Sequence, residues 1–371
     1  MGMAGGSGPL SGPGILNAFL AWQAATGGAP RDWDFGTDPT DRPALPLPGD
    51  LLFPGESATD KALADWLATV APHLVQPVRL LRPAPKARGL RRLFGERGAA
   101  SSETLNPSDR LVSAMLGAPE GRYVVVRAIL TDVTRLTIAL ARDAARRGGR
   151  VFSGGAEATP AGEEPAGLFA VLARPWPEMA GLHELPTVAG PLSLIPLPGD
   201  LMLAHAPAGG ELATARDLQG LLQATLSRKA MVRQVSQGSV GGVAVLRDLL
   251  PLAEGLSAGT DPLHDGEMAG GHGLFANRVA ATWAHLDAAI IRTLIARHGA
   301  STPELLDGVH RDADLGEDFG GGLRAREVGW MMRHEWATDA DSVLHRRGPF
   351  ALLGADAGRL HRWMEQNGGL V

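Results

Sequence analysis

The chain has 371 residues, of which 44% are hydrophobic and 20% charged, as in a globular protein large enough for two domains. The net charge of −5 gives no general attraction to nucleic acid, and the lack of cysteine excludes disulfides, thiolate metal sites and cysteine nucleophiles. No run approaches the ~20 apolar residues of a membrane span, and the first residues do not resemble a secretory signal. We therefore expect a cytoplasmic protein, with peripheral contact on the inner face of the plasma membrane left open.

Apolar periodicity divides the chain into predicted elements. Helices are predicted over 15–25, 62–70, 131–147, 211–227 and 276–298, and strands over 123–128 and 150–153. The strand–helix–strand order at 123–153 is typical of an α/β sheet. Residues 84–100 form a basic amphipathic patch, for which a solvated surface helix is favoured over contact with anionic lipid.

The stretch 322–353 has the pattern of two amphipathic helices with a tight break between them. In the first helix, apolar residues such as Val328 and Met331 share one face, and charged residues, including Glu327 and Glu335, fill most of the other. Thr338 occupies the position expected for the N-cap of the second helix. The sequence therefore predicts a helical hairpin here.

The same stretch carries the spacing E-x-A-T-x-x-D-x-x-L-x-R-R, which resembles the C-terminal helical domain of the FAD-dependent (aerobic, quinone-linked) glycerol-3-phosphate dehydrogenases. Its positions are Glu335, Ala337, Thr338, Asp341, Leu344, Arg346 and Arg347. Further segments at 71–75, 132–148 and 193–204 resemble the same family, the last as a hairpin. The resemblance implies a trimmed FAD-binding α/β domain (Rossmann-like, glutathione-reductase type) over 1–299 and an all-helical C-terminal domain over 300–371.

The resemblance also implies FAD as the cofactor, with its phosphate turn at 7–15. Such a turn needs three glycines, but Pro9 stands at one of the positions and has no N–H for a phosphate. The preceding strand is also missing from the pattern, so we weigh a working turn against a flexible, truncated N-terminus. The candidate cofactor-binding residues are Gly8, Gly12, Gly14, Pro175, Trp176, Gly270 and Gly271.

Members of the family oxidise glycerol 3-phosphate to dihydroxyacetone phosphate and pass the electrons to quinone. The substrate would then be a small phosphorylated polyol, and the candidate residues for its phosphate are Arg247, His272 and Arg278. This chain differs from the family at several of these positions. Leu52 and Phe53 stand where the family has an arginine and a tyrosine that help hold the substrate, and His272 stands where it has a lysine. The catalytic residues themselves stay unknown.

Two functions follow from these departures. The chain is either a divergent dehydrogenase of this family with impaired or altered activity, or a non-catalytic relative that acts as an interaction or regulatory module. The acidic and histidine residues of the glycine-rich loop at 264–272 have no helix to bring them together, so we expect no metal site.

Overall fold

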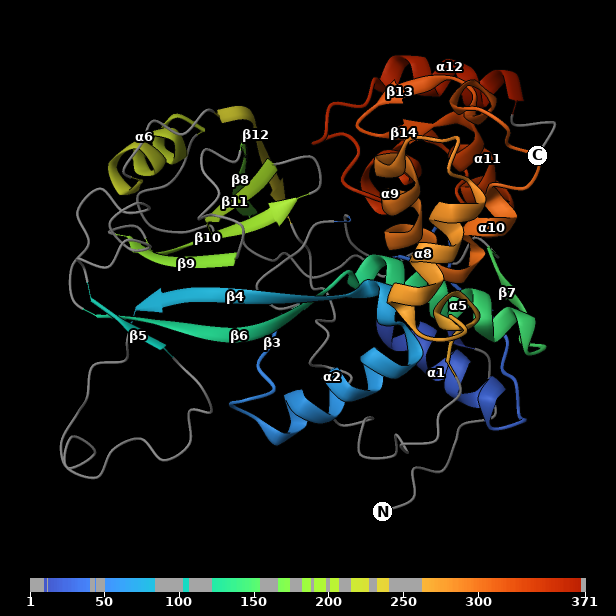
Figure 1. Ribbon diagram of the computed structural model, residues 1–371, viewed down its shortest axis with the longest axis horizontal. Coiled ribbons are helices and arrows are strands. Elements are labelled where there is room, and N and C mark those ends of the chain that lie inside the picture. Colours follow the sequence, from blue (N-terminus) through green and yellow to red (C-terminus); the bar gives the residue numbers. More distant parts are fainter. Residues whose placement is uncertain are drawn as a thin grey trace.

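The computed structural model has two groups of elements, a large sheet and a body that contains most of the helices, and the long strands β4 and β6 reach from one to the other (Figure 1). The residues that the structure describes are 10–11, 13–40, 44, 51–83, 103–106, 122–153, 166–173, 182–187, 190–197, 201–206, 215–226, 232–239 and 262–367. The basic patch at 84–100 lies outside them.

In the described part of the chain, the large sheet has nine strands in the order β12-β8-β11-β10-β9-β4-β6-β3, with β5 paired to β6. The pair β4–β9 is parallel, and the other pairs are antiparallel. The strands are β3 (Leu51–Leu52), β4 (Val75–Pro83), β5 (Glu103–Leu105), β6 (Tyr123–Thr131), β8 (Ala166–Ala173), β9 (Leu182–Thr187), β10 (Gly190–Leu197), β11 (Leu201–Ala206) and β12 (Val232–Ser239). The predicted hairpin is confirmed as β10 and β11.

Alternation along the strands gives this sheet two apolar faces, because neighbouring side chains point to opposite sides. On one face, Leu194 belongs to the cluster that packs against Leu218 and Leu222 of α6 (Ala215–Thr225). On the other face, Ile195 belongs to a cluster that Leu352, from the C-terminal helical region, partly covers. One face is therefore covered by α6, and the other is partly covered by the turn that contains Leu352.

A second sheet is parallel and has the order β1-β2-β7 in the described residues. Its strands are β1 (Leu10–Ser11), β2 (Trp33–Asp34) and β7 (Val151–Phe152). The helices α1 (Ile15–Thr26), α2 (Ala58–Val70) and α5 (Val133–Arg146) pack with it. The predicted strand–helix–strand order is observed as β6, α5 and β7. The expected crossover within one sheet is wrong, however, because β6 belongs to the large sheet and β7 to the parallel sheet.

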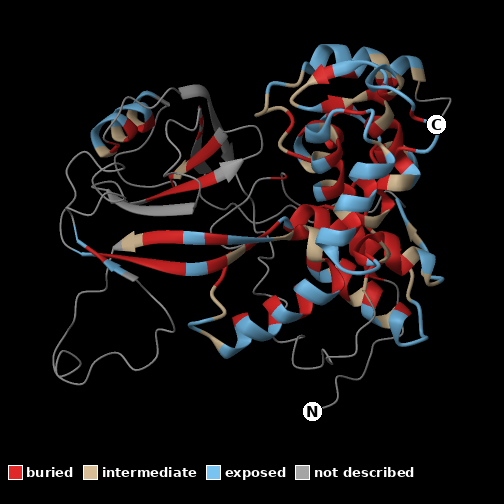
Figure 2. Cartoon of the chain, viewed as in Figure 1, coloured by how far each residue is buried: buried red, intermediate tan, exposed pale blue. Residues whose placement is uncertain are grey.

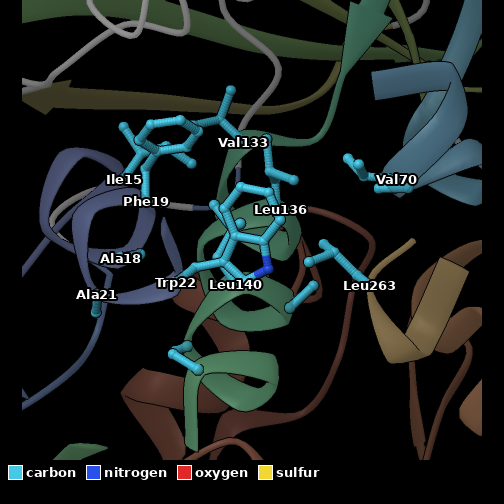
Figure 3. Packing of buried hydrophobic residues seen from close by; sticks show 14 of the residues in the cluster. Ile15, Ala18, Phe19, Ala21, Trp22, Val70, Val133, Leu136, Leu140 and Leu263 are labelled. Carbon is cyan, nitrogen blue, oxygen red and sulfur yellow. The ribbon is translucent and has the colours of Figure 1, made fainter. Parts of the chain in front are cut away.

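The core of this region lies where α1 meets α5, a helix that is buried along nearly its whole length (Figure 2). Phe19 and Trp22 of α1 pack against Leu136 and Leu140 of α5 (Figure 3). The Trp22 indole N–H donates to the Asp143 carboxylate at 3.0 Å, so the polar atom of this buried ring is satisfied.

The C-terminal region contains α8 (His272–Thr282), α9 (Ala288–His298), α10 (Thr302–Leu305), α11 (Ala325–His334), a π-helical turn at Ser342–Arg346 and α12 (Ala357–Asn367), with the hairpin β13 (Asp318–Gly320) and β14 (Leu323–Arg324). The single helix predicted at 276–298 is wrong. The chain turns between α8 and α9, and Asp287 caps α9 by accepting the Ala289 N–H at 2.7 Å.

The predicted break in the helical hairpin is confirmed, but its cap is not Thr338. Asp339 accepts the Ser342 N–H at 2.7 Å and so begins the second helical segment. The turn itself lies at Trp336, whose φ of 56° is in the left-handed region. Its ring packs edge-on against Phe35, just after β2, so the strained residue is held by a contact between the two regions.

Candidate functional site

The carboxyl ends of β1 and β2 lie side by side at one edge of the parallel sheet. Dinucleotides bind in the crevice at such an edge of parallel α/β sheets, and we refer to this edge as the β1–β2 crevice. α1 begins directly after β1, at Gly14, whose φ is 106°. No side chain caps this helix, and its first turn contains no acidic residue. The start of α1 therefore keeps the positive end of its dipole without a negative side chain of its own.

The structure corrects the position of the predicted phosphate turn. The strand predicted to be missing exists as β1, because Leu10 and Ser11 pair in parallel with Trp33 and Asp34. The turn that leads into α1 therefore follows Ser11, so only the second part of the predicted stretch 7–15 can form it. Asn17 then stands where the third glycine of a G-x-G-x-x-G turn would lie.

Asn17 changes how this helix meets the strand. A third glycine allows close packing of helix and strand, whereas the Asn17 side-chain amide donates to the Ser11 carbonyl at 2.9 Å. The helix start is thus tied to the end of β1 by a side-chain hydrogen bond.

Asp34 is a candidate residue that the sequence interpretation missed. It ends β2, about twenty residues after Gly14, where dinucleotide-binding sheets place an acidic residue for the ribose. One of its carboxylate oxygens accepts the Gly36 N–H at 3.0 Å, which fixes the side chain at the strand end. The sequence does contain a sign of this residue: an acidic side chain between two apolar ones, at 33–35, about twenty residues after the glycines.

The second group of candidates lies at the start of α8. Gly270 and Gly271 have φ values of 81° and 88°, and Gly271 is the N-cap. Arg278 donates to the Ala269 carbonyl at 2.8 Å, and the His272 ring nitrogen lies 3.3 Å from the Met268 sulfur. The structure thus brings Gly270, Gly271, His272 and Arg278 into one exposed turn, while Gly14 belongs to α1.

The remaining predicted site residues are Gly8, Gly12, Pro175, Trp176 and Arg247, and they lie outside the described residues. Leu52 is buried in β3, and Phe53, which follows it, packs beneath the Arg82 guanidinium at 5.4 Å from the ring centroid. These two positions are therefore occupied by packing side chains.

The glycine-rich loop before α8 is held by a buried ion pair. Asp265 accepts from Arg142 at 2.9 Å and from the Ser301 hydroxyl at 2.5 Å. Burial, the largest single influence, would raise the pKa of this carboxyl, but the charge of Arg142 and the Ser301 hydrogen bond together outweigh it, and the pKa is lowered. Within the described ranges, no group of three or more histidine and acidic residues could hold a metal ion.

Two acidic residues that were predicted for the polar face, Glu327 and Glu335, are buried. Glu335 is fully buried and accepts from both terminal nitrogens of Arg135, in α5, at 2.7 and 2.8 Å. Glu327 is also buried and contacts Arg297 and His298 at 2.9 Å. These two carboxylates thus face α9 and α5 instead of solvent.

Arg347 makes a second buried connection. Its guanidinium donates to Asp38 at 3.0 and 3.1 Å and to the Glu335 backbone carbonyl at 2.6 Å. Ser342 donates to the same Asp38 carboxylate at 2.6 Å. Asp38 follows β2 by four residues, so the motif anchors the loop beside Asp34.

No helix within the described residues is long and apolar enough to cross a membrane.

Comparison with known protein families found no family model that matches the chain. A glycerol-3-phosphate dehydrogenase of Pseudomonas aeruginosa is 41% identical over 92 residues, which are 25% of this chain and 18% of that protein. The D-erythritol 1-phosphate dehydrogenase of Brucella abortus is 29% identical over 107 residues, 29% of this chain and 21% of that protein. The matched segments therefore span about a fifth of the length of these relatives.

Among solved structures, a glycerol-3-phosphate dehydrogenase from Bacillus halodurans, complexed with FAD, has the same fold. Its TM-score is 0.65 at 15% sequence identity, over 98% of this chain and 89% of that one. The fold class predicted from the sequence, an α/β domain of the FAD-binding type with a helical C-terminal region, is thereby confirmed. The sequence match and the fold agree: about a quarter of the chain is similar in sequence to a glycerol-3-phosphate dehydrogenase, and the whole chain has the fold of the FAD-complexed enzyme from Bacillus halodurans.

Proposed function

We propose that this chain binds FAD at the carboxyl ends of β1 and β2 and oxidises a small phosphorylated polyol, with an activity altered from that of its relatives. The observation that carries the proposal is the β1–α1–β2 unit. It places an uncapped helix start at Gly14 and the Asp34 carboxylate at the end of the next strand.

The residues of the crevice fit the adenosine diphosphate half of the cofactor. The α1 start would receive the pyrophosphate, because its N–H groups and dipole attract negative charge. Asp34 would accept hydrogen bonds from the ribose hydroxyls. When bound, the flavin ring supplies the acceptor for the electrons of the oxidised alcohol.

The substrate class is proposed from the relatives and from the start of α8. Both named relatives act on a polyol that carries a phosphate. The first turn of α8 contains no acidic residue, and Gly271 leaves its start open to an anion. His272 and Arg278, with Arg247, are our candidates for the phosphate, and quinone is the proposed electron acceptor.

Asn17 and the pairing of Arg278 support an altered activity. The asparagine side chain occupies the approach to the strand that glycine would leave open. Arg278 already donates to a backbone carbonyl of its own turn, which lowers the number of its donors left for a phosphate. The same two observations favour a second candidate function, a non-catalytic relative that serves as an interaction or regulatory module.

The visible absorption spectrum of the purified chain, with and without added FAD, tests the proposal. We expect a flavin band that bleaches when glycerol 3-phosphate or D-erythritol 1-phosphate is added without oxygen. A flavin band that no phosphorylated polyol bleaches would refute the oxidation. No band with excess FAD, in a cooperatively folded protein, would support the non-catalytic candidate.

A matched pair of variants tests the crevice itself. Asp34→Ala removes the proposed ribose acceptor, and Asp32→Ala removes a carboxylate two residues away that pairs with Arg150. We expect Asp34→Ala to weaken FAD binding at least tenfold, as for about 1.4 kcal/mol of lost interaction, and Asp32→Ala to leave it unchanged. Equal effects of both variants would place the nucleotide elsewhere.

A further inference from the structure

The C-terminal region contains a pocket that lies apart from the β1–β2 crevice. Its volume is about 170 Å³, and α9 forms one wall with Ile290, Thr293 and Leu294. Leu305 and Leu315 contribute from α10 and from the turn at 312–315, and the wall that includes β14 carries the side chain of Arg324. The pocket is therefore mostly apolar, with one cationic residue in its lining.

The volume limits what this pocket can hold. An engineered apolar cavity of about 150 Å³ in another protein binds benzene. A pocket of 170 Å³ is too small for a nucleotide or a flavin, which need sites of about 300 Å³ or more. It suits a short apolar chain or a single small ring.

The charges around the pocket favour an anionic head group. Both oxygens of Glu327, the acidic residue of the lining, accept from Arg297 at 2.9 Å, and one also contacts His298. This carboxylate is thus neutralised by groups behind it. Arg324, in contrast, is partly exposed and pairs through one nitrogen with Asp318, at 3.0 Å, whose own side chain is about half exposed.

A guanidinium has five N–H donors, and this one bridge uses few of them. Those that remain can form charge-assisted hydrogen bonds with a ligand carboxylate, and such bonds are about twice as strong as neutral ones. A neutral ligand of the same size would bury the same apolar surface without them.

We propose that this pocket binds a small carboxylate with a short apolar chain, its tail between α9 and the leucines and its carboxylate on Arg324. The site is independent of the FAD crevice, so it holds whether or not the chain is a dehydrogenase.

Hexanoate is a suitable ligand for the test, and 1-hexanol is its neutral counterpart. Titration calorimetry on the full chain, supported by saturation-transfer NMR, should show saturable hexanoate binding about tenfold tighter than that of hexanol. No saturable hexanoate binding below about 10 mM would overturn the proposal. Equal affinity for the two ligands would overturn the carboxylate class.

Two pairs of variants locate the binding. Ala289→Phe adds a ring to an alanine that lines the pocket, whereas Ala288→Phe adds the same ring one residue earlier on α9, outside the lining. We expect the first to abolish hexanoate binding and the second to preserve it. The opposite result, or loss in both, would refute the placement.

Arg324→Gln tests the head group and should reduce hexanoate affinity about tenfold while leaving hexanol unchanged. Its control is Arg359→Gln, which removes a comparable surface pair with Glu317 outside the pocket lining. Unchanged hexanoate affinity in Arg324→Gln would refute the role of the guanidinium.

Discussion

The buried pair of Arg135 and Glu335 gives a sharp test of how the helical region is held. Glu335→Gln keeps the shape of the side chain but leaves the Arg135 guanidinium, which is 4% exposed, without its counterion. Breaking a buried pair in this way costs about 3–5 kcal/mol. The pair joins residues 200 positions apart, so the loss should fall on the contact between α5 and the C-terminal region.

The double variant Arg135→Met/Glu335→Leu should recover part of this loss. Apolar residues of similar volume often replace a buried pair at little cost. Here Arg135 also donates to the Arg297 carbonyl at 2.8 and 3.0 Å, and that acceptor would lose its partner. We therefore expect the double variant to remain about 1–2 kcal/mol below the parent.

Urea unfolding, followed by both tryptophan fluorescence and circular dichroism, measures these differences and shows whether one transition suffices. Asp65→Asn is the control, because it breaks the Lys61–Asp65 pair, whose side chains are 61% and 65% exposed, and should cost less than about 1 kcal/mol. The reasoning is refuted if Glu335→Gln costs no more than this control.

The stability difference between the parent and Glu335→Gln should depend on pH in a direction that follows from the pKa of Glu335. Burial, the largest single influence, would raise the pKa of Glu335, but Arg135 and the hydrogen bond with His298 together outweigh it and hold the pKa well below its usual range. The unfolded chain therefore binds this proton more readily, and the stabilisation is present above pH ~4.5 and lost as pH falls toward the folded pKa. The difference between parent and Glu335→Gln should shrink over that range.

Three further substitutions test the hydrophobic core, a glycine in close contact with a backbone carbonyl, and the titration of His73. Phe19→Ala, in the cluster of α1 and α5, should lower the free energy of unfolding by about 3–5 kcal/mol in urea titrations. Gly299→Ala should lower the free energy of unfolding by about 3 kcal/mol or more, because the added Cβ would lie 2.0 Å from the Asp265 carbonyl oxygen. Its control, Gly308→Ala, also has a positive φ but open space around the added Cβ, and it should cost only about 1–2 kcal/mol. Burial lowers the pKa of His73 to about 3, so between pH 6.5 and 4 the unfolded chain binds this proton and the folded chain does not. As the pH is lowered through this range, the free energy of unfolding of the parent should fall by up to about 1.4 kcal/mol per pH unit. The fall should be smaller in His73→Leu.

The apolar periodicity of the sequence correctly predicted those helices whose buried residues recur at helical spacing. The helix at 131–147 is observed as α5, because Leu136 and Leu140 share the face that meets α1. The single helix at 276–298 was wrong because apolar residues continue through the turn. The signal that was overlooked is Asp287, an N-cap residue directly before α9.

Other features depend on contacts between distant parts of the chain. Glu327 and Glu335 lie on a stripe that helical periodicity assigns to solvent, and only the tertiary structure brings Arg135 and Arg297 to them. β1 is two residues long and is defined by its pairing with β2, so no local pattern could predict it. For the same reason, the sequence could not show that the turn begins only after Ser11, within the predicted stretch 7–15.

The C-terminal motif at 335–347 has a structural role, and its contacts extend to the loop beside the β1–β2 crevice. Arg347 is fully buried, and a buried guanidinium requires an anion, which Asp38 supplies from the loop that follows β2. That loop begins at the Asp34 end of the strand, and its Pro39 carbonyl accepts the Gly14 N–H at 2.9 Å. The C-terminal motif thus fixes, through one loop, both residues that we assign to the nucleotide. A chain can keep this motif and this crevice geometry while the residues around the substrate change, because the two depend on different side chains.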